Sequence, residues 1–340
     1  MQRRGFLILL GATVVLVVLA LVAALGGDRN VVRVAPNERA LPGLGPKLGD
    51  LAWLRLTHGP TKINFAQIGG QWAVVEKGNY PANQGKIRQL LLGLADLSLV
   101  EAKTERAELF SRIGLDDPSN GNSTLVSVQD RSGANVGELI LGKRKFDRLG
   151  GGNDGVYVRK PGADRTWLAR GTVEANGEPV SWIDRRIIDI PEKRIASVKL
   201  TGTDGAAVTL KRDKPEAGFT IENPPADSVA KADMVLAKPA GALEAVDLDD
   251  VKPTAELPVP DRDAATATLT TFDGLNVEVF LFEREGVNWA VFDVSGAGGA
   301  EAEAKALADK VSRWSYAIPA VKANALRTKL ADLVEPPKPS

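Results

Sequence analysis

The segment Leu51-Ala-Trp-Leu-Arg-Leu-Thr57 returns about 144 residues later as Ile195-Ala-Ser-Val-Lys-Leu-Thr201. In both segments apolar and polar side chains alternate, which is typical of a strand with one buried face. Because the strand patterns that follow are short and separated by Gly and Asp turns, we expect an antiparallel meander in each copy. The following strands are 63–68 and Gly70-Gln-Trp72 in the first copy, and 207–211 and Gly218-Phe219 in the second; Asp130-Arg-Ser-Gly133 and Asp273-Gly274 are matching hairpin turns.

A helix pattern follows the first strands of each copy. Asn83 is a candidate N-cap in the first copy, and the residues after it place one apolar face at helical spacing, namely Ile87, Leu90, Leu91 and Leu94. The counterpart over 227–245 contains Pro239, which should kink or split the helix. After further strands, two more helix patterns end the second copy, over Ala304 to Val311 and over 321–333.

Strands followed by segregated helices indicate the α+β class. We predict an N-terminal transmembrane helix followed by two tandem, similar α+β domains with antiparallel sheets and packed helices. The predicted segments are a cytoplasmic N-terminus (1–4), a transmembrane helix (5–25), a Gly/Pro-rich tether (26–49), a first α+β repeat (50–191), a second α+β repeat (192–335) and a disordered tail (336–340).

The transmembrane prediction comes from one uncharged run of 21 residues near the start of the chain. As a helix, this run would span about 31 Å, close to the ~30 Å of a bilayer's hydrocarbon core. Its backbone polar groups would be satisfied internally only in a helix. Positions along the predicted anchor are Gly5, Leu10, Val15, Ala20 and Leu25.

The orientation of the anchor follows from its flanking charges. Arg3 and Arg4 precede the run, which places the N-terminus in the cytoplasm and the rest of the chain in the periplasm. We therefore expect a single-pass protein of the bacterial inner membrane, with the lipid bilayer as one partner. A cleaved signal peptide, with a small-residue site at Val22-Ala23-Ala24, remains the alternative.

The amino-acid composition argues against several classes of function. The chain has 43 basic and 43 acidic residues, and removal of the first 25 residues leaves a net charge of −2. A near-neutral body argues against nucleic-acid binding, which needs a strong basic field. The chain has no cysteine, which excludes thiolate nucleophiles, zinc–thiolate sites and iron–sulfur clusters, and its single histidine excludes His-cluster metal sites. We expect no cofactor, no metal and no catalytic set.

Two groups of polar residues are candidates for reactive sites. His58 lies in His58-Gly-Pro60, where we expect an exposed turn, and the chain has no Gly-x-Ser-x-Gly elbow to supply a nucleophile. The carboxylate pairs Asp116-Asp117 and Asp249-Asp250 lack the alternating ligands of a calcium loop, so turn and capping roles are expected.

Aromatic residues offer a different kind of site. Trp53, Trp72, Trp167 and Trp289 lie in strand patterns, where burial is the expectation. The aromatic residues near the ends of the two copies are candidates for an exposed partner groove that would suit a peptide or a glycan. These groove candidates are Trp182, Trp314 and Tyr316.

A series of short motifs runs in a fixed order over most of residues 50–335. They are Gly70-Gln-Trp72 with the helix through Leu94-Ala-Asp-Leu97, then Gly114-Leu-Asp-Asp-Pro118, Leu139-Ile-Leu-Gly142, Gly155-Val-Tyr157, Ser181-Trp-Ile-Asp-Arg-Arg186 and Trp314-Ser-Tyr-Ala-Ile-Pro319. In this order the chain resembles the bacterial domain-of-unknown-function family DUF4340. The resemblance implies a membrane-anchored protein with an extracytoplasmic body, and many such proteins look like accessories of gliding-motility-type ABC transport systems. It carries over no catalytic residue, and Pro239 departs from the uninterrupted helix that the family leads us to expect.

We therefore expect a non-enzymatic, membrane-anchored periplasmic binding or scaffold module, an accessory of an ABC-type transport system whose partner is an integral-membrane transporter. Two alternatives remain open. One is a periplasmic carboxylate-dependent hydrolase that uses Asp116, Asp117, Asp249 and Asp250. The other is a released glycan-binding protein, which requires cleavage near Ala24.

Overall fold

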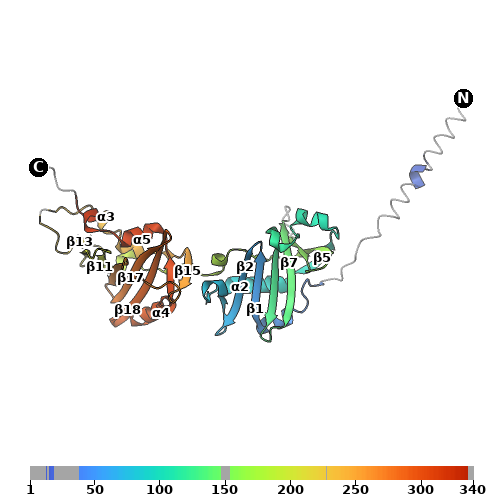
Figure 1. Cartoon of the computed structure of the whole chain (residues 1–340), viewed down its shortest axis with the longest axis horizontal. Coiled ribbons are helices and arrows are strands. Elements are labelled where there is room, and N and C mark those ends of the chain that lie inside the picture. The colour runs from blue at the N-terminus through green and yellow to red at the C-terminus, as the bar shows by residue number, and fades with distance from the viewer. Residues whose placement is uncertain (1–12, 14, 19–37, 147–153, 227, 336–340) are drawn as a thin grey trace, which may run out of the picture. The chain divides into compact units, whose positions relative to one another are not determined.

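The computed structural model describes residues 13, 15–18, 38–146, 154–226 and 228–335. These residues form mostly antiparallel β structure, with two large sheets and a few helices (Figure 1). The chain divides into two compact units. The first unit comprises the residues up to Asn64 together with Gly85–Gly177, and the second comprises Phe65–Gln84 and the residues from Glu178 onward.

The first sheet has nine strands in the order β4-β3-β2-β1-β6-β7-β8-β9-β5. One helix, α2 (Gln84–Asp96), buries its predicted apolar face, so this face belongs to the core. The strands are β1 (Leu51–His58), β2 (Thr61–Ile68), β3 (Gln71–Val74), β4 (Tyr80–Pro81), β5 (Ser98–Ala102), β6 (Thr124–Asp130), β7 (Asn135–Lys145), β8 (Gly155–Arg159) and β9 (Thr166–Arg170).

The second sheet has eight strands in the order β13-β12-β11-β16-β17-β18-β19-β15. A separate two-stranded sheet joins β10 (Arg186–Ile188) to β14 (Val246–Asp247). The strands of the large sheet are β11 (Ile195–Thr201), β12 (Ala207–Lys211), β13 (Thr220–Ile221), β15 (Asp250–Pro253), β16 (Ala265–Thr271), β17 (Leu275–Arg284), β18 (Val287–Gly296) and β19 (Trp314–Ala317).

The order of strands repeats from one sheet to the other. Without β4, the first sheet reads β3-β2-β1-β6-β7-β8-β9-β5, and the second has the same order with each number raised by ten. The register also shifts at the same place in both, between Leu51 and Trp53 and between Ile195 and Ser197. The repeated segments of the sequence are thus the equivalent strands β1 and β11.

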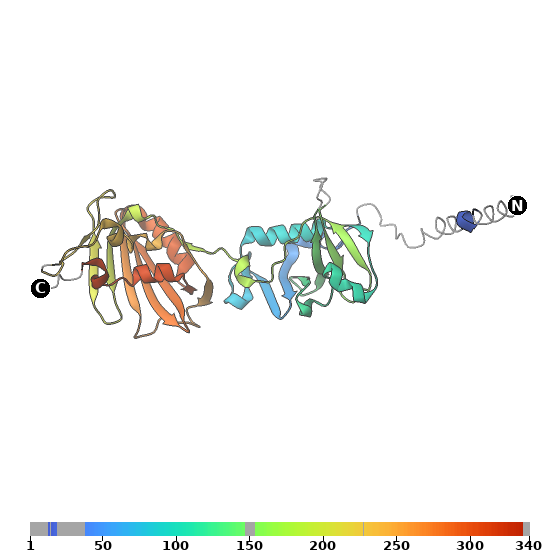
Figure 2. The ribbon, with the colours of Figure 1, turned by 90° about the horizontal axis from the view of Figure 1, so that it is seen from above.

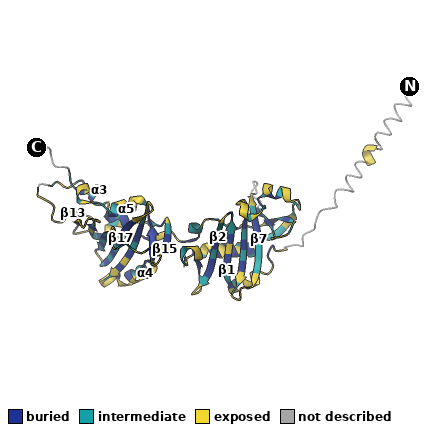
Figure 3. Cartoon of the chain, viewed as in Figure 1, coloured by how far each residue is buried: buried dark blue, intermediate teal, exposed yellow. Residues whose placement is uncertain are grey.

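Loops cover part of the sheets in a similar way. In the first unit, Phe110 and Leu115, from the loop between β5 and β6, pack on Ile140 of β7. In the second unit, Leu257, from the loop between β15 and β16, packs with Phe282 and Trp289 of β17 and β18. Figure 3 shows buried and less buried residues alternating along the strands, as expected for sheets with a buried face.

The helices differ between the two halves. Between β4 and β5 the chain forms the continuous α2, whereas between β13 and β14 it forms α3 (Asp233–Leu236) and the 3-10 helix η7 (Ala240–Leu243), separated at Pro239. The predicted split is therefore confirmed, because proline cannot donate to the preceding turn. A further helix, α4 (Glu301–Val311), lies between β18 and β19 and packs on β18 (Figure 2).

Three of the predicted segments fall wholly or largely outside the described residues, and the first of them is the cytoplasmic N-terminus, 1–4. Gly5–Leu25 is described only at residue 13 and at 15–18, which are helical, and the tail 336–340 is not described. Within the described part of the chain, no helix combines the length and the apolar character needed to cross a bilayer.

The predicted tether, 26–49, is wrong for its second half. Residues 26–37 are outside the described part, but from residue 38 the chain packs on the first unit. Ala40 and Leu44 are buried, the Ala40 N–H donates to the Leu97 carbonyl at 2.9 Å, and the Leu99 N–H donates to the Glu38 carbonyl at 2.7 Å. Backbone pairing and apolar burial therefore outweigh the Gly and Pro content that suggested a linker.

The turn between β6 and β7 is held by Asp130. Its Oδ1 accepts hydrogen bonds from the Ser132 hydroxyl at 2.6 Å, the Ser132 N–H at 3.0 Å and the Ala134 N–H at 3.1 Å. The Lys47 ammonium lies 3.3 Å from Oδ2. These contacts, above all the bond from the Ser132 hydroxyl, lower the pKa of Asp130 to about 2.

This pKa predicts how stability changes in acid. An unfolded Asp titrates near ~3.9, so the ionised carboxylate stabilises the folded state above about pH 4, and this stabilisation is lost as the pH falls through about 2. We expect the thermal midpoint of the wild type to fall more steeply than that of Asp130→Asn between these values. Equal slopes in thermal unfolding monitored by circular dichroism would contradict the assignment.

Candidate functional site

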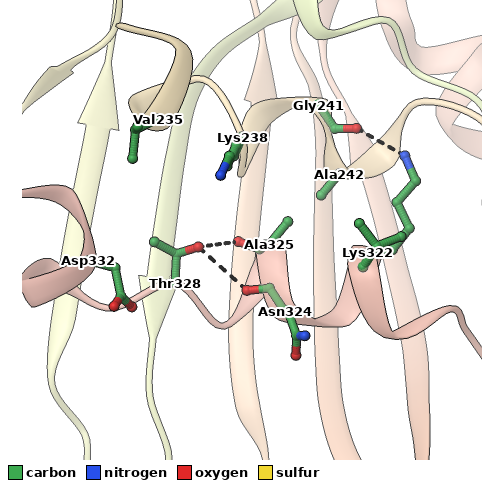
Figure 4. A pocket seen from close by; sticks show the side chains of 10 residues that line it. Val235, Lys238, Gly241, Ala242, Lys322, Asn324, Ala325, Thr328 and Asp332 are labelled. Carbon is green, nitrogen blue, oxygen red and sulfur yellow. Dashed lines mark hydrogen bonds between the residues drawn. The ribbon is translucent and has the colours of Figure 1, made fainter. Parts of the chain in front are cut away.

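The second unit carries a groove of about 750 Å³ between two short helical regions (Figure 4). One wall comes from α3 and η7, and the other from α5 (Ala320–Leu326) and α6 (Leu330–Leu333). The residues that line it are Val235, Lys238, Gly241, Ala242, Val321, Lys322, Asn324, Ala325, Thr328 and Asp332.

Two prolines set the helix ends that form the walls of the groove, and one lysine links the two walls. α3 ends at Leu236 and Pro239 is the N-cap of the 3-10 helix η7, so the wall consists of two short helices rather than one long one. Pro319 is the N-cap of α5. The Lys322 ammonium then joins the walls, because it donates to the carbonyls of Gly241, at 3.2 Å, and Glu244.

The groove has an apolar part and a polar rim. Val235, Ala242 and Ala325 supply the apolar part, and Thr328 uses its hydroxyl to cap the Ala325 carbonyl at 2.9 Å. Burial lowers the pKa of Lys322, and the carboxylate of Glu244 opposes this shift. The rim therefore presents ammonium and amide groups beside carbon surface, a combination found in ligand sites.

Two large apolar side chains near the groove are exposed to solvent. Val321 lines it and is 72% exposed, and Met234, next to Val235 on α3, is 78% exposed. Isolated exposed apolar side chains are common on protein surfaces, but their position beside a groove is typical of an interaction site.

The predicted partner groove at Trp182, Trp314 and Tyr316 is wrong as an exposed feature, because these side chains are only 3%, 7% and 0% exposed. The Trp182 ring stacks edge-on against Phe65 with centroids 5.4 Å apart. Tyr80, which belongs to the same unit, lies 4.9 Å from Trp314. Burial also raises the pKa of Tyr316. These aromatic residues fill the core of the second unit.

The tryptophans assigned to strands behave differently from one another. Trp72 and Trp289 are buried as predicted, whereas Trp53 is 47% exposed and the prediction of its burial is wrong. Trp53 lies on the same face as exposed Arg55, opposite buried Leu54 and Leu56. The register shift between Leu51 and Trp53 allows Leu51 to be buried as well, although strict alternation would place it on the face of Trp53.

The structure brings His58 close to the loop that contains Asp116. His58 is half-buried, and its Nδ1 lies 3.1 Å from both the Ser123 carbonyl and the Thr124 hydroxyl. The Ser123 hydroxyl donates to the Asp116 carbonyl at 2.9 Å. The expectation of an exposed turn histidine is therefore wrong, because His58 is the last residue of β1 and ties that strand to the loop.

Among the candidate carboxylates, Asp117 takes the expected capping role, whereas Asp249 and Asp250 form ion pairs that the sequence did not predict. Asp117 caps the short helix at Pro118–Asn120, and the Ser119 hydroxyl and N–H lower its pKa. In the second unit, Asp249 lies 3.0 Å from Arg185, and Asp250 lies 2.5 Å from Lys77. Among the described residues, no group of three His, Asp or Glu side chains could hold a metal ion.

Sequence reasoning missed the groove between α3–η7 and α5–α6. Its two walls are about 80 residues apart in the chain, and neither carries a motif. The available signals were Pro239 and Pro319, which mark the helix breaks, but they do not reveal that the two breaks lie side by side.

A protein-family model described as a domain of unknown function (DUF4340) matches residues 72–288. A search of curated proteins found no match.

Proposed function

The chain belongs to the DUF4340 family, and from this premise we propose that it is a non-enzymatic, membrane-anchored periplasmic module that binds and positions a partner. We further propose that the partner is an integral-membrane component of an ABC-type transport system. The observation that carries the proposal is the groove between α3–η7 and α5–α6, with exposed Met234 and Val321 beside it.

Two other features support a binding role. The uncharged run Gly5–Leu25 follows Arg3 and Arg4, a pattern typical of an anchor that leaves the body outside the cytoplasm. Three of the four candidates for hydrolysis, namely Asp117, Asp249 and Asp250, are engaged in a helix cap and two ion pairs, and this favours structural use of these three carboxylates.

Purification from the native membrane tests the proposal. The full chain, extracted in mild detergent after gentle crosslinking, should retain an integral-membrane protein that mass spectrometry identifies as a transport component. Recovery of the monomer alone would overturn it. Equal recovery of the partner by a chain that lacks residues 1–25 would show that the anchor does not contribute.

A further inference from the structure

The groove between α3–η7 and α5–α6 contains three charged side chains, and two of them are already engaged. Lys322 donates to the carbonyls of Gly241 and Glu244. The Asp332 carboxylate accepts the Lys329 N–H at 3.0 Å, which caps α6. Lys238 is exposed, and its ammonium has no partner in the described part of the chain.

Lys238 also lies beside carbon surface. It follows α3 and lines the groove with Val235 and Ala242 (Figure 4). An ammonium next to apolar side chains favours a ligand that offers a carboxylate adjacent to apolar groups, because both features are then matched.

Asn324 adds a feature that suits a peptide backbone. It is exposed on the rim, and its side-chain amide offers donors and an acceptor together. A main-chain N–H and C=O could pair with such an amide. The volume of about 750 Å³ suits a few residues of chain.

We propose that this groove binds a short segment of a partner protein in which an acidic side chain lies next to apolar ones. The carboxylate pairs with Lys238, the apolar side chains cover Val235, Ala242 and Ala325, and Asn324 holds the backbone. This inference rests on the proposed binding function and adds the chemistry of the partner.

A peptide library tests this chemistry even while the partner is unidentified. The full chain in detergent micelles is used to select from random heptapeptides that are N-acetylated and C-amidated, so that side chains are the sole source of carboxylates. We expect the selected pool to be enriched in Asp or Glu beside Leu, Ile, Val, Met or Phe. The charge reversal Lys238→Glu should lower the affinity for a selected peptide about tenfold, as measured by fluorescence anisotropy.

Matched variants separate the groove from the rest of the unit. Lys199→Glu makes the same charge change at an exposed position of β11 and should leave binding unchanged. Ala325→Trp fills the groove and should abolish binding, whereas Ala331→Trp, at an exposed position of α6, should not. Circular dichroism confirms that each variant is folded.

Three outcomes would overturn the inference. They are a pool without acidic enrichment, unchanged affinity in Lys238→Glu, and a preference for a second library with free C-terminal carboxylates, which would point to chain ends instead of acidic side chains. In each case a membrane partner recovered by crosslinking would still support the proposed function, so the two failures are distinguishable.

Discussion

Replacing Arg212 with alanine is expected to lower the free energy of unfolding of the second unit by about 3 kcal/mol, because it removes a buried guanidinium that donates to one carboxylate and three carbonyls. The Arg212 side chain is only 3% exposed, and its Nη1 lies 2.7 Å from the Glu192 carboxylate. It also donates to the carbonyls of Ile195, Pro215 and Glu192. The guanidinium lies over the Phe219 ring, 4.4 Å from its centroid.

Several of these acceptors would lose their donor in Arg212→Ala, although Glu192 is partly exposed and would be rehydrated. Arg212→Lys should recover little of the loss, since an ammonium cannot reproduce the planar fork. Lys211→Ala is the matched control, because its pair with Glu222 is solvent-exposed and should contribute less than about 1 kcal/mol. Urea unfolding with hydrogen exchange at β11 and β12 provides the measurement. Equal effects of Arg212→Ala and Lys211→Ala would contradict the buried role of Arg212.

Replacing Trp182 with alanine should have the larger effect, a loss of about 4 kcal/mol, as is usual when a buried Trp or Phe is truncated. Trp182 is 3% exposed and packs on Phe65. The Asn83 N–H donates to its carbonyl at 2.7 Å, a bond that the substitution leaves available. The predicted loss therefore comes from the cavity and from the missing ring contact.

Trp53→Ala is the matched control for this prediction. The Trp53 ring is 47% exposed, so its truncation should cost less than about 1.5 kcal/mol. Both variants are compared by urea unfolding followed by circular dichroism. A smaller loss in Trp182→Ala than in Trp53→Ala would show that Trp182 is not part of the core.

The repeated strands were predictable because alternation of apolar side chains is a local property. The segments at Leu51 and Ile195 form equivalent strands in two sheets of the same order. Alternation does not reveal a register shift, which depends on the hydrogen-bonded neighbour. For this reason the burial of Leu51 on the same face as Leu54 and Leu56 could not be read from the sequence, and the burial of Trp53 was wrongly expected.

The helices likewise show that local features can be predicted from the sequence, whereas features that depend on tertiary contacts cannot. Pro239 correctly predicted the break between α3 and η7, since the effect of proline on a helix is local. The groove was harder to predict, because it forms only where two helix breaks that are distant in the sequence lie next to each other in the folded unit. The aromatic groove candidates failed for a related reason: a large apolar ring suits a core as well as a binding surface, and burial decides between the two.

The segment before β1 also shows tertiary contacts outweighing local composition. Gly and Pro in 26–49 suggested a linker, yet Leu44 is fully buried and Ala40 pairs with Leu97. The described first unit therefore begins earlier in the chain than the predicted boundary at residue 50.

The most direct test of the proposed binding function is purification from native membranes after gentle crosslinking, carried out in parallel on the wild type, Ala325→Trp and Ala331→Trp. We expect the wild type and Ala331→Trp to retain the same integral-membrane protein, and Ala325→Trp to lose it while remaining folded and anchored. Retention of that protein by all three, or recovery of the monomer alone from the wild type, would contradict a partner site in the groove.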